Sequence, residues 1–165
     1  MKRIKFKMEV CREFDESDPY SNAFLTQEMC DLLNPRLPKA LVPSYQAIYA
    51  VFANVPTSFQ SNSKNLFFRT MRLSLINSFS QKFKKNAKDK ELKVELIFFI
   101  VKDYKTRDVD NLIKLVLDGI QGYWYDDDGQ IKIVHAEKYK VKDIDKSVNP
   151  KLYEQIYCAV SILEN

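Results

Sequence analysis

The sequence predicts an α+β fold, a single-domain mixed sheet flanked by helices, from three observations. Its 165 residues are the usual length of one domain. Hydrophobic residues make up 45% of the chain and aromatic residues 13%, which provides enough apolar surface for a folded core. Segments with the periodicity of strands and of helices follow one another, without the strict alternation that an all-parallel α/β sheet shows.

The first 44 residues are predicted to be an N-terminal extension of the main domain. Residues 4–10 alternate between apolar and polar side chains, which is typical of a strand. A helix is predicted over residues 23–33, and three prolines within 35–43 then indicate a loop. The boundary therefore falls near residue 44, before a main domain of residues 45–165. The extension is either an appendage on a smaller core or an arm that binds another protein or completes a dimer.

The main domain is expected to contain four strands and two helices. Apolar stripes with helical spacing predict the helices, and alternating or continuous apolar runs predict the strands. The nearly continuous apolar run from Leu96 onward predicts a central strand that is buried on both faces. The expected strands span residues 45–52, 92–101, 131–140 and 155–163, and the expected helices span residues 64–85 and 109–121.

The composition excludes several classes of protein. Only 3 glycines are present, so a glycine-rich phosphate loop or dinucleotide fingerprint is nearly excluded. Cys11, Cys30 and Cys158 have no zinc-binding spacing and are expected to be free thiols in a reducing cytoplasm. No run approaches the roughly 18 apolar residues of a membrane span, and charged residues interrupt the N-terminus too early for a signal peptide. We therefore expect a cytoplasmic protein without a membrane partner.

Positive and negative charges are segregated along the chain, although the net charge is only +4. A basic stretch covers residues 64–93, and acidic residues concentrate within 108–128. This arrangement suits a polyanionic substrate held near a divalent cation. The alternative is a solvated, lysine-rich helix end. The candidates for contacts with a DNA backbone are Lys64, Arg69, Arg72, Lys82, Lys84 and Lys85.

The acidic residues are the strongest candidates for a catalytic site. Asp108 and Asp110 lie where the chain turns from a buried strand into a helix, and side chains two apart in extended backbone point to the same side. Such a pair can share Mg²⁺, and Asp128 or one of the two aspartates before it can add a ligand from the start of the next strand. This set suits metal-assisted phosphodiester hydrolysis. Lys114, one helical turn after Asp110, can reach the scissile phosphate or the attacking water.

Structural explanations compete with this hypothesis. An aspartate before a helix is commonly an N-cap, and Asp-Asp-Asp-Gly is a common exposed turn. Asp110, Lys114 and Asp118 are spaced for ordinary surface ion pairs. The single histidine, His135, is expected to be structural rather than to order a metal-bound water. Trp124 is expected to pack beneath the acidic turn rather than to stack on exposed bases.

The same segment resembles the signature of RusA-type Holliday junction resolvases in both order and spacing. The motif covers about 25 residues, with weaker similarity over 49–60 and none in the first 44. The family usually has a glycine where this chain has Ala53-Asn54. The matching residues are Arg107-Asp108-Val109-Asp110-Asn111-Leu112, then Lys114, Asp118-Gly119-Ile120, Gly122 and Asp127-Asp128-Gly129-Gln130-Ile131.

The resemblance implies a RusA-like fold and a homodimer, dependent on Mg²⁺ or Mn²⁺, that nicks opposed strands of a four-way DNA junction. Gln130 fixes the alignment and selects Asp128 among the three adjacent aspartates. A nuclease for other branched DNA and a non-catalytic DNA-binding module remain alternatives. The implied metal ligands are Asp108, Asp110 and Asp128, with Lys114 as a catalytic lysine and Asn111, Asp118 and Asp127 in supporting roles.

Overall fold

The computed structural model describes most of the chain and confirms the α+β class. The described residues are 27–36, 45–53, 55, 61–142, 144–147 and 149–163. The strand expected over residues 4–10 lies outside them. Of the helix expected over residues 23–33, the described part forms α1 (Gln27–Leu33), which is followed by a 3-10 turn at Asn34–Arg36.

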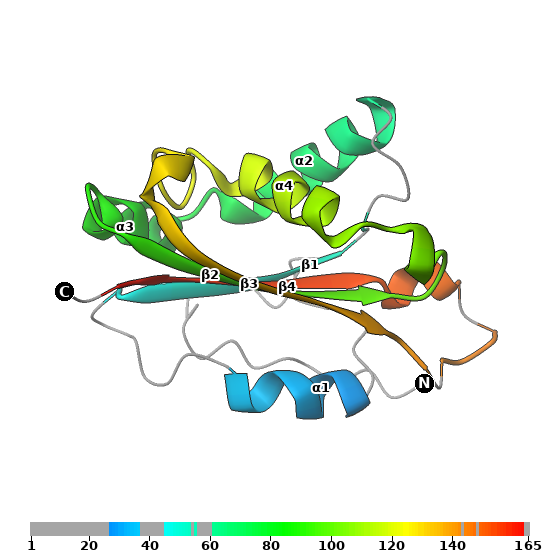
Figure 1. The fold of residues 1–165 in the computed structure, drawn as a ribbon. Helices are drawn as coiled ribbons and strands as arrows, with labels where there is room; N and C mark the ends of the chain where they lie inside the picture. The colour runs from blue at the N-terminus through cyan, green and yellow to red at the C-terminus, as the bar shows by residue number, and fades with distance from the viewer. Residues whose placement is uncertain are drawn as a thin grey trace.

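A mixed sheet of four strands forms the centre of the described structure (Figure 1). Its order is β1 (Ala47–Ala53), β4 (Gln155–Ile162), β2 (Leu92–Ile100) and β3 (Ile131–Lys140). β4 pairs antiparallel with both β1 and β2, whereas β2 and β3 are parallel. All four strands therefore lie close to their expected positions.

β2 is a central strand, as its apolar run predicts. Its last five residues, from Leu96 to Ile100, are all buried. Helices cover the sheet on both faces, with α2, α3 and α4 on one side and α1 on the other (Figure 1). α4 (Val109–Ile120) connects β2 to β3 and runs back along the sheet. No helix among the described residues is long and apolar enough to cross a membrane.

The single helix expected over residues 64–85 is wrong, because the chain forms two helices there. These are α2 (Ser61–Leu75) and α3 (Ser78–Ala87). Asn77 adopts an extended backbone conformation, and its side chain accepts a hydrogen bond from the Ser80 amide at 2.7 Å. This contact caps α3 and satisfies an amide that would otherwise lack a partner. The apolar stripe continues across the break, and for that reason periodicity alone did not reveal it.

Candidate active site

Asp108 and Asp110 lie at the N-terminal end of α4. Asp108 is the N-cap residue, but its side chain makes no capping hydrogen bond, and both carboxylates are exposed. Neither carboxylate makes an ion pair or hydrogen bond with another side chain in the described part of the chain. Helix capping therefore does not explain Asp108. The positive end of the helix dipole favours both negative charges at this position.

Lys114 and Asn111 are exposed on the same helix. Lys114 makes no ion pair with Asp110 or Asp118, although both lie four residues away. The surface ion pairs considered as an alternative are thus absent from this described helix. The ammonium group of Lys114 remains available for an external anion.

Asp128 lies beyond the opposite end of α4. The start of β2 pairs with the start of β3, through Leu92 and Ile131, so the acidic turn lies at that end of the sheet. Asp108 follows the other end of β2. The 12 residues of α4 separate the two carboxylates by about 18 Å along the helix axis. Within the described ranges, no group of three or more His, Cys, Asp or Glu side chains is close enough to hold a metal ion. One protomer therefore does not bring Asp108, Asp110 and Asp128 together.

The three aspartates of the acidic turn have different neighbours. Asp126 forms an exposed ion pair with Lys84 at 3.3 Å. Asp127 caps the 3-10 turn Asp128–Gln130, with its side chain accepting a hydrogen bond from the Gly129 amide at 2.6 Å. The carboxylate of Asp128 instead accepts a hydrogen bond from a tyrosine hydroxyl. Asp127 thus stabilises the turn itself, as the structural explanation expected, Asp126 pairs with α3, and the carboxylate of Asp128 does neither.

Gln130 attaches this turn to the end of α3. Its side-chain oxygen accepts hydrogen bonds from the amides of Asp126 and Asp127, at 2.9 and 3.3 Å. Its side-chain nitrogen donates to the carbonyls of Ala87 and Lys90, at 2.8 and 3.1 Å. Gln130 therefore fixes both the shape and the position of the segment that carries Asp128.

Tyr125 is the buried residue that contacts Asp128. Its hydroxyl lies 2.8 Å from Oδ1 of Asp128 and 3.0 Å from the carbonyl oxygen of Leu117. Burial raises the pKa of Tyr125 far above its ordinary value, and the nearby charges of Asp128 and Asp118 raise it further. The hydroxyl therefore stays protonated and acts as a donor. Asp118 lies in the last turn of α4 and therefore at the same end of this helix as Asp128.

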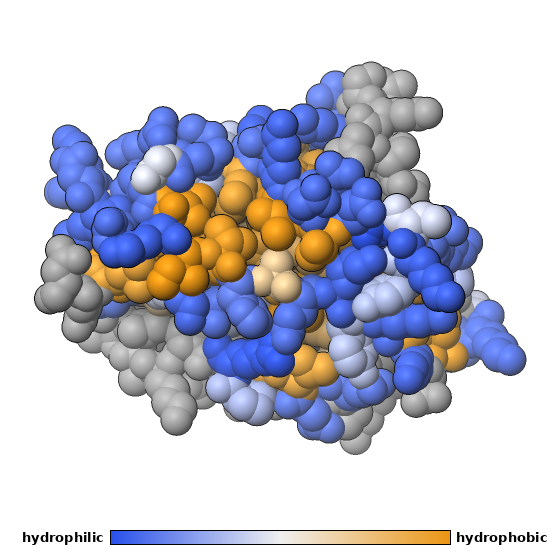
Figure 2. Space-filling model, in the orientation of Figure 1, coloured by the Kyte–Doolittle hydropathy of each residue, from blue (hydrophilic) through white to orange (hydrophobic). Residues whose placement is uncertain are grey.

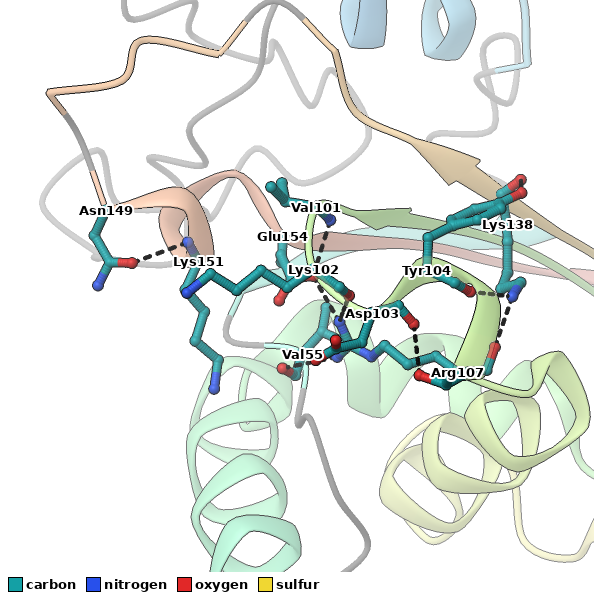
Figure 3. Close-up of polar contacts among 11 residues, drawn as sticks. Val55, Val101, Lys102, Asp103, Tyr104, Arg107, Lys138, Asn149, Lys151 and Glu154 are labelled. Carbon is teal, nitrogen blue, oxygen red and sulfur yellow. Dashed lines mark hydrogen bonds and ion pairs between the residues drawn. The ribbon is translucent and has the colours of Figure 1, made fainter.

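A buried ion pair holds the loop that leads from β2 to Asp108 (Figure 3). Arg107 donates to Glu154 at 2.6 Å and to the carbonyl of Val55 at 3.2 Å, and both charged side chains are at most 5% exposed. The carboxylate of Glu154 also accepts a hydrogen bond from the Val101 amide at 3.0 Å. These contacts fix both ends of the loop and thereby the start of α4.

Lys138 of β3 supports the same loop from the other side (Figure 3). Its ammonium group donates to the carbonyls of Tyr104 and Arg107, at 2.6 and 2.8 Å, and lies 4.4 Å from the centre of the Tyr104 ring. No local pattern in the chain indicates these positioning residues, except that Arg107 belongs to the motif. Glu154 and Lys138 carry no motif and are far from Arg107 in the chain.

The candidate DNA-binding residues are not equivalent. Arg72 donates to the backbone carbonyls of Asp118 and Gly119, at 3.2 and 3.4 Å, and therefore joins α2 to the last turn of α4. Lys84 pairs with Asp126. The ammonium groups of Lys64 and Lys82 lie over aromatic rings. Arg69 and Lys85 are exposed and have no ion-pair partner among the described residues.

Trp124 and His135 were both expected to have structural roles, and the structure bears on the two predictions differently. Trp124 is 1% exposed, packs against Phe52 and donates from its indole nitrogen to the Ser80 hydroxyl at 3.0 Å. This confirms that Trp124 packs in the core and is not an exposed stacking surface. His135 is exposed on β3 and lies 3.8 Å from Glu137, so its predicted structural role stays a prediction.

Comparison with known families identifies a match over the centre of the chain. Residues 56–149, more than half of the chain, match the family model for the endodeoxyribonuclease RusA. The match includes every candidate catalytic residue. It begins after β1 and ends before β4, although β4 lies between β1 and β2 in the sheet. No curated protein matches the chain.

Proposed function

Because the chain belongs to the RusA family, and is therefore an endodeoxyribonuclease that hydrolyses the DNA backbone, we propose that it resolves four-way junctions in recombination or repair, using a divalent metal ion. The observation that carries the proposal is the pair of exposed carboxylates at the start of α4, Asp108 and Asp110. Neither makes a hydrogen bond or an ion pair with another described side chain. A pair placed at a helix N-terminus, with the preceding loop fixed by a buried ion pair, is suited to binding rather than to stabilising the fold.

The donor atoms fit Mg²⁺ or Mn²⁺. Asp108 and Asp110 offer carboxylate oxygens, which hard divalent cations prefer. When bound, such a cation activates the attacking water and neutralises charge on the phosphate. The carboxylates would hold the cation, and the ammonium group of Lys114 would bind the scissile phosphate. In this proposal the metal ligands are Asp108, Asp110 and Asp128, Lys114 is the catalytic lysine, and Asn111, Asp118 and Asp127 support them.

A homodimer would bring the separated carboxylates together. In a twofold dimer, each copy presents the same surface to the other. Two antiparallel copies of α4 would place the start of one helix beside the end of its partner. Asp128 of a second copy could then complete the set that Asp108 and Asp110 begin. The dimer would contain two such sites, one for each of the two strands cut at a junction.

The face that carries α4 and β3 is suited to this contact. Figure 2 shows an apolar area over the face on which these two elements lie in Figure 1. Val134 of β3, in phase with Lys138 on the α4 side of the sheet, is 41% exposed, and Ile113 and Leu117 of α4 are only partly buried. β3 is also the last strand in the sheet order, so its outer edge pairs with no described strand. Association of two copies would remove this surface from water.

We also propose that residues 45–165 are the nuclease domain. The sheet supports this boundary, because β1 and β4 lie outside the family match, yet β4 pairs with both β1 and β2. α1 packs on the sheet through the buried side chains of Met29 and Leu33, and Glu28 of α1 and Arg36 of the following turn contact Tyr139 and Glu137, so its removal should lower the stability of the sheet. A chain that begins at residue 45 should still form the sheet and cleave DNA. Loss of folding on this deletion would make residues 1–44 part of the domain.

Cleavage of a synthetic mobile four-way junction tests the proposed function. The wild-type chain should nick it in Mg²⁺ or Mn²⁺ and not in EDTA, and Asp110→Asn should be inactive. A wild-type chain without activity in either metal would overturn the proposal. Equal cleavage of three-way junctions, flaps and four-way junctions would widen the substrate to branched DNA in general. Equal cleavage of linear duplex would remove branch specificity.

A further inference from the structure

The hydroxyl of Tyr125 faces two acceptors but has one proton to donate. It lies 2.8 Å from Oδ1 of Asp128 and 3.0 Å from the carbonyl oxygen of Leu117. That carbonyl already accepts a hydrogen bond from the Gln121 amide at 3.0 Å. The Leu117 carbonyl therefore does not depend on Tyr125. The carboxylate of Asp128 has no other hydrogen-bond donor among the described residues.

The ring of Tyr125 is rigidly placed. The residue is 0% exposed, and the backbone carbonyl of Tyr125 accepts a hydrogen bond from the Gly122 amide at 2.7 Å. The hydroxyl consequently cannot move with the exposed turn that carries Asp128. A fixed donor that contacts an exposed carboxylate restricts the rotamers of that carboxylate.

We propose that Tyr125 is a positioning residue that holds the Asp128 carboxylate in place for metal binding, an inference that rests on the proposed function. The second acceptor gives the hydroxyl an alternative when the carboxylate is engaged. It can then rotate and donate to the Leu117 carbonyl, so that no buried donor is left without a partner. Asp128 is thus oriented before the metal arrives and is not held back afterwards.

Tyr125→Phe and Tyr157→Phe form a matched pair for the test. Both tyrosines are buried, and both changes remove one hydroxyl. The Tyr157 hydroxyl donates to the Arg36 carbonyl at 3.3 Å, on the α1 side of the sheet. Mn²⁺ affinity, followed by the electron paramagnetic resonance signal of free Mn²⁺, should fall about tenfold in Tyr125→Phe. It should change less than twofold in Tyr157→Phe.

Two further measurements separate positioning from a general loss of structure. Excess Mg²⁺ should restore the maximal cleavage rate of Tyr125→Phe, because only the metal requirement rises. In an Asp128→Asn background, Tyr125→Phe should have no additional effect on Mn²⁺ binding. Equal Mn²⁺ affinity in the two tyrosine variants, or an additional loss in the Asp128→Asn background, would overturn the inference. A wild-type chain that binds Mn²⁺ no better than Asp128→Asn would instead contradict the proposed ligand set.

Discussion

The three aspartates of the acidic turn are adjacent in the chain, yet their carboxylates have different partners. Asp126 pairs with Lys84, and Asp127 caps the turn. The carboxylate of Asp128 accepts a hydrogen bond only from the hydroxyl of Tyr125 among the described residues. Hydrogen bonding therefore distinguishes three chemically identical side chains. It leaves Asp128 as the aspartate of the turn that can act as a ligand without loss of a cap or an ion pair.

Asp108→Asn should abolish cleavage of a four-way junction and leave junction binding largely intact. The amide keeps the size of the side chain but removes the negative charge that a divalent cation needs. Asp103→Asn is the matched control, because Asp103 is an exposed aspartate in the same loop. Its backbone is left-handed, with φ of 55°, and asparagine tolerates this conformation well. Cleavage rates in Mg²⁺ and gel-shift binding without metal provide the measurements. Full cleavage by Asp108→Asn would remove this residue from the mechanism.

At the scale of elements, the length of α4 sets the distance between Asp108 at its start and Asp128 beyond its end. Near its C-terminal end, α4 contacts Arg72 and Met71 of α2. Arg72 donates to the last-turn carbonyls, and Met71 occupies the space where a side chain at Gly119 would lie. A side chain at Gly119 would therefore displace the end of the Met71 side chain, which packs between α2 and α4. At the N-terminal end, the Arg107–Glu154 pair fixes the preceding loop.

Glu154→Gln should destabilise the fold by about 3 kcal/mol, because it leaves the buried guanidinium of Arg107 without its counter-charge. Glu91→Gln removes the same charge from an exposed pair with Lys132, at 2.9 Å, and should cost less than about 1 kcal/mol. Urea unfolding of both variants and the wild type measures the difference. Equal destabilisation would show that the buried pair does not anchor the loop.

Arg69→Ala and Lys85→Ala should each weaken junction binding and reduce the salt slope by about 1, because each removes one exposed cation from α2 or α3. Lys132→Ala is the control, since the ammonium of Lys132 is paired with Glu91. Binding is measured without divalent metal at several salt concentrations. Salt slopes identical to that of the wild type would exclude the α2–α3 surface as a DNA contact.

At the scale of the whole molecule, local sequence patterns predicted the helices and strands better than the way in which these elements pair and pack. The apolar run of β2 and the stripe of α4 are local, and both elements lie where expected. The pairing of Arg107 with Glu154 depends on how β4 inserts between β1 and β2, which no local pattern shows. The break at Asn77 depends on one capping contact that the helical stripe hides.

In the candidate site, too, the residues could be identified from local patterns, but their arrangement in space could not. The motif identified Asp108, Asp110 and Asp128, and their short separation in sequence suggested one cluster. Parallel pairing of β2 and β3 instead requires α4 to return along the sheet, which places Asp128 at the far end. The chemistry of the side chains could be inferred from the sequence. Their distance could not, because it depends on strand direction.

Mixing two inactive variants tests the shared site most directly. Asp108→Asn and Asp128→Asn should each be inactive alone. If each site takes Asp108 from one copy and Asp128 from the other, a mixed dimer has one intact site and should nick one strand of a four-way junction in Mg²⁺. Unfolding and refolding the two variants together allows the copies to exchange, and the mass in solution should be about twice 19.4 kDa. A mixed dimer of this mass that leaves the junction uncut would contradict the shared site.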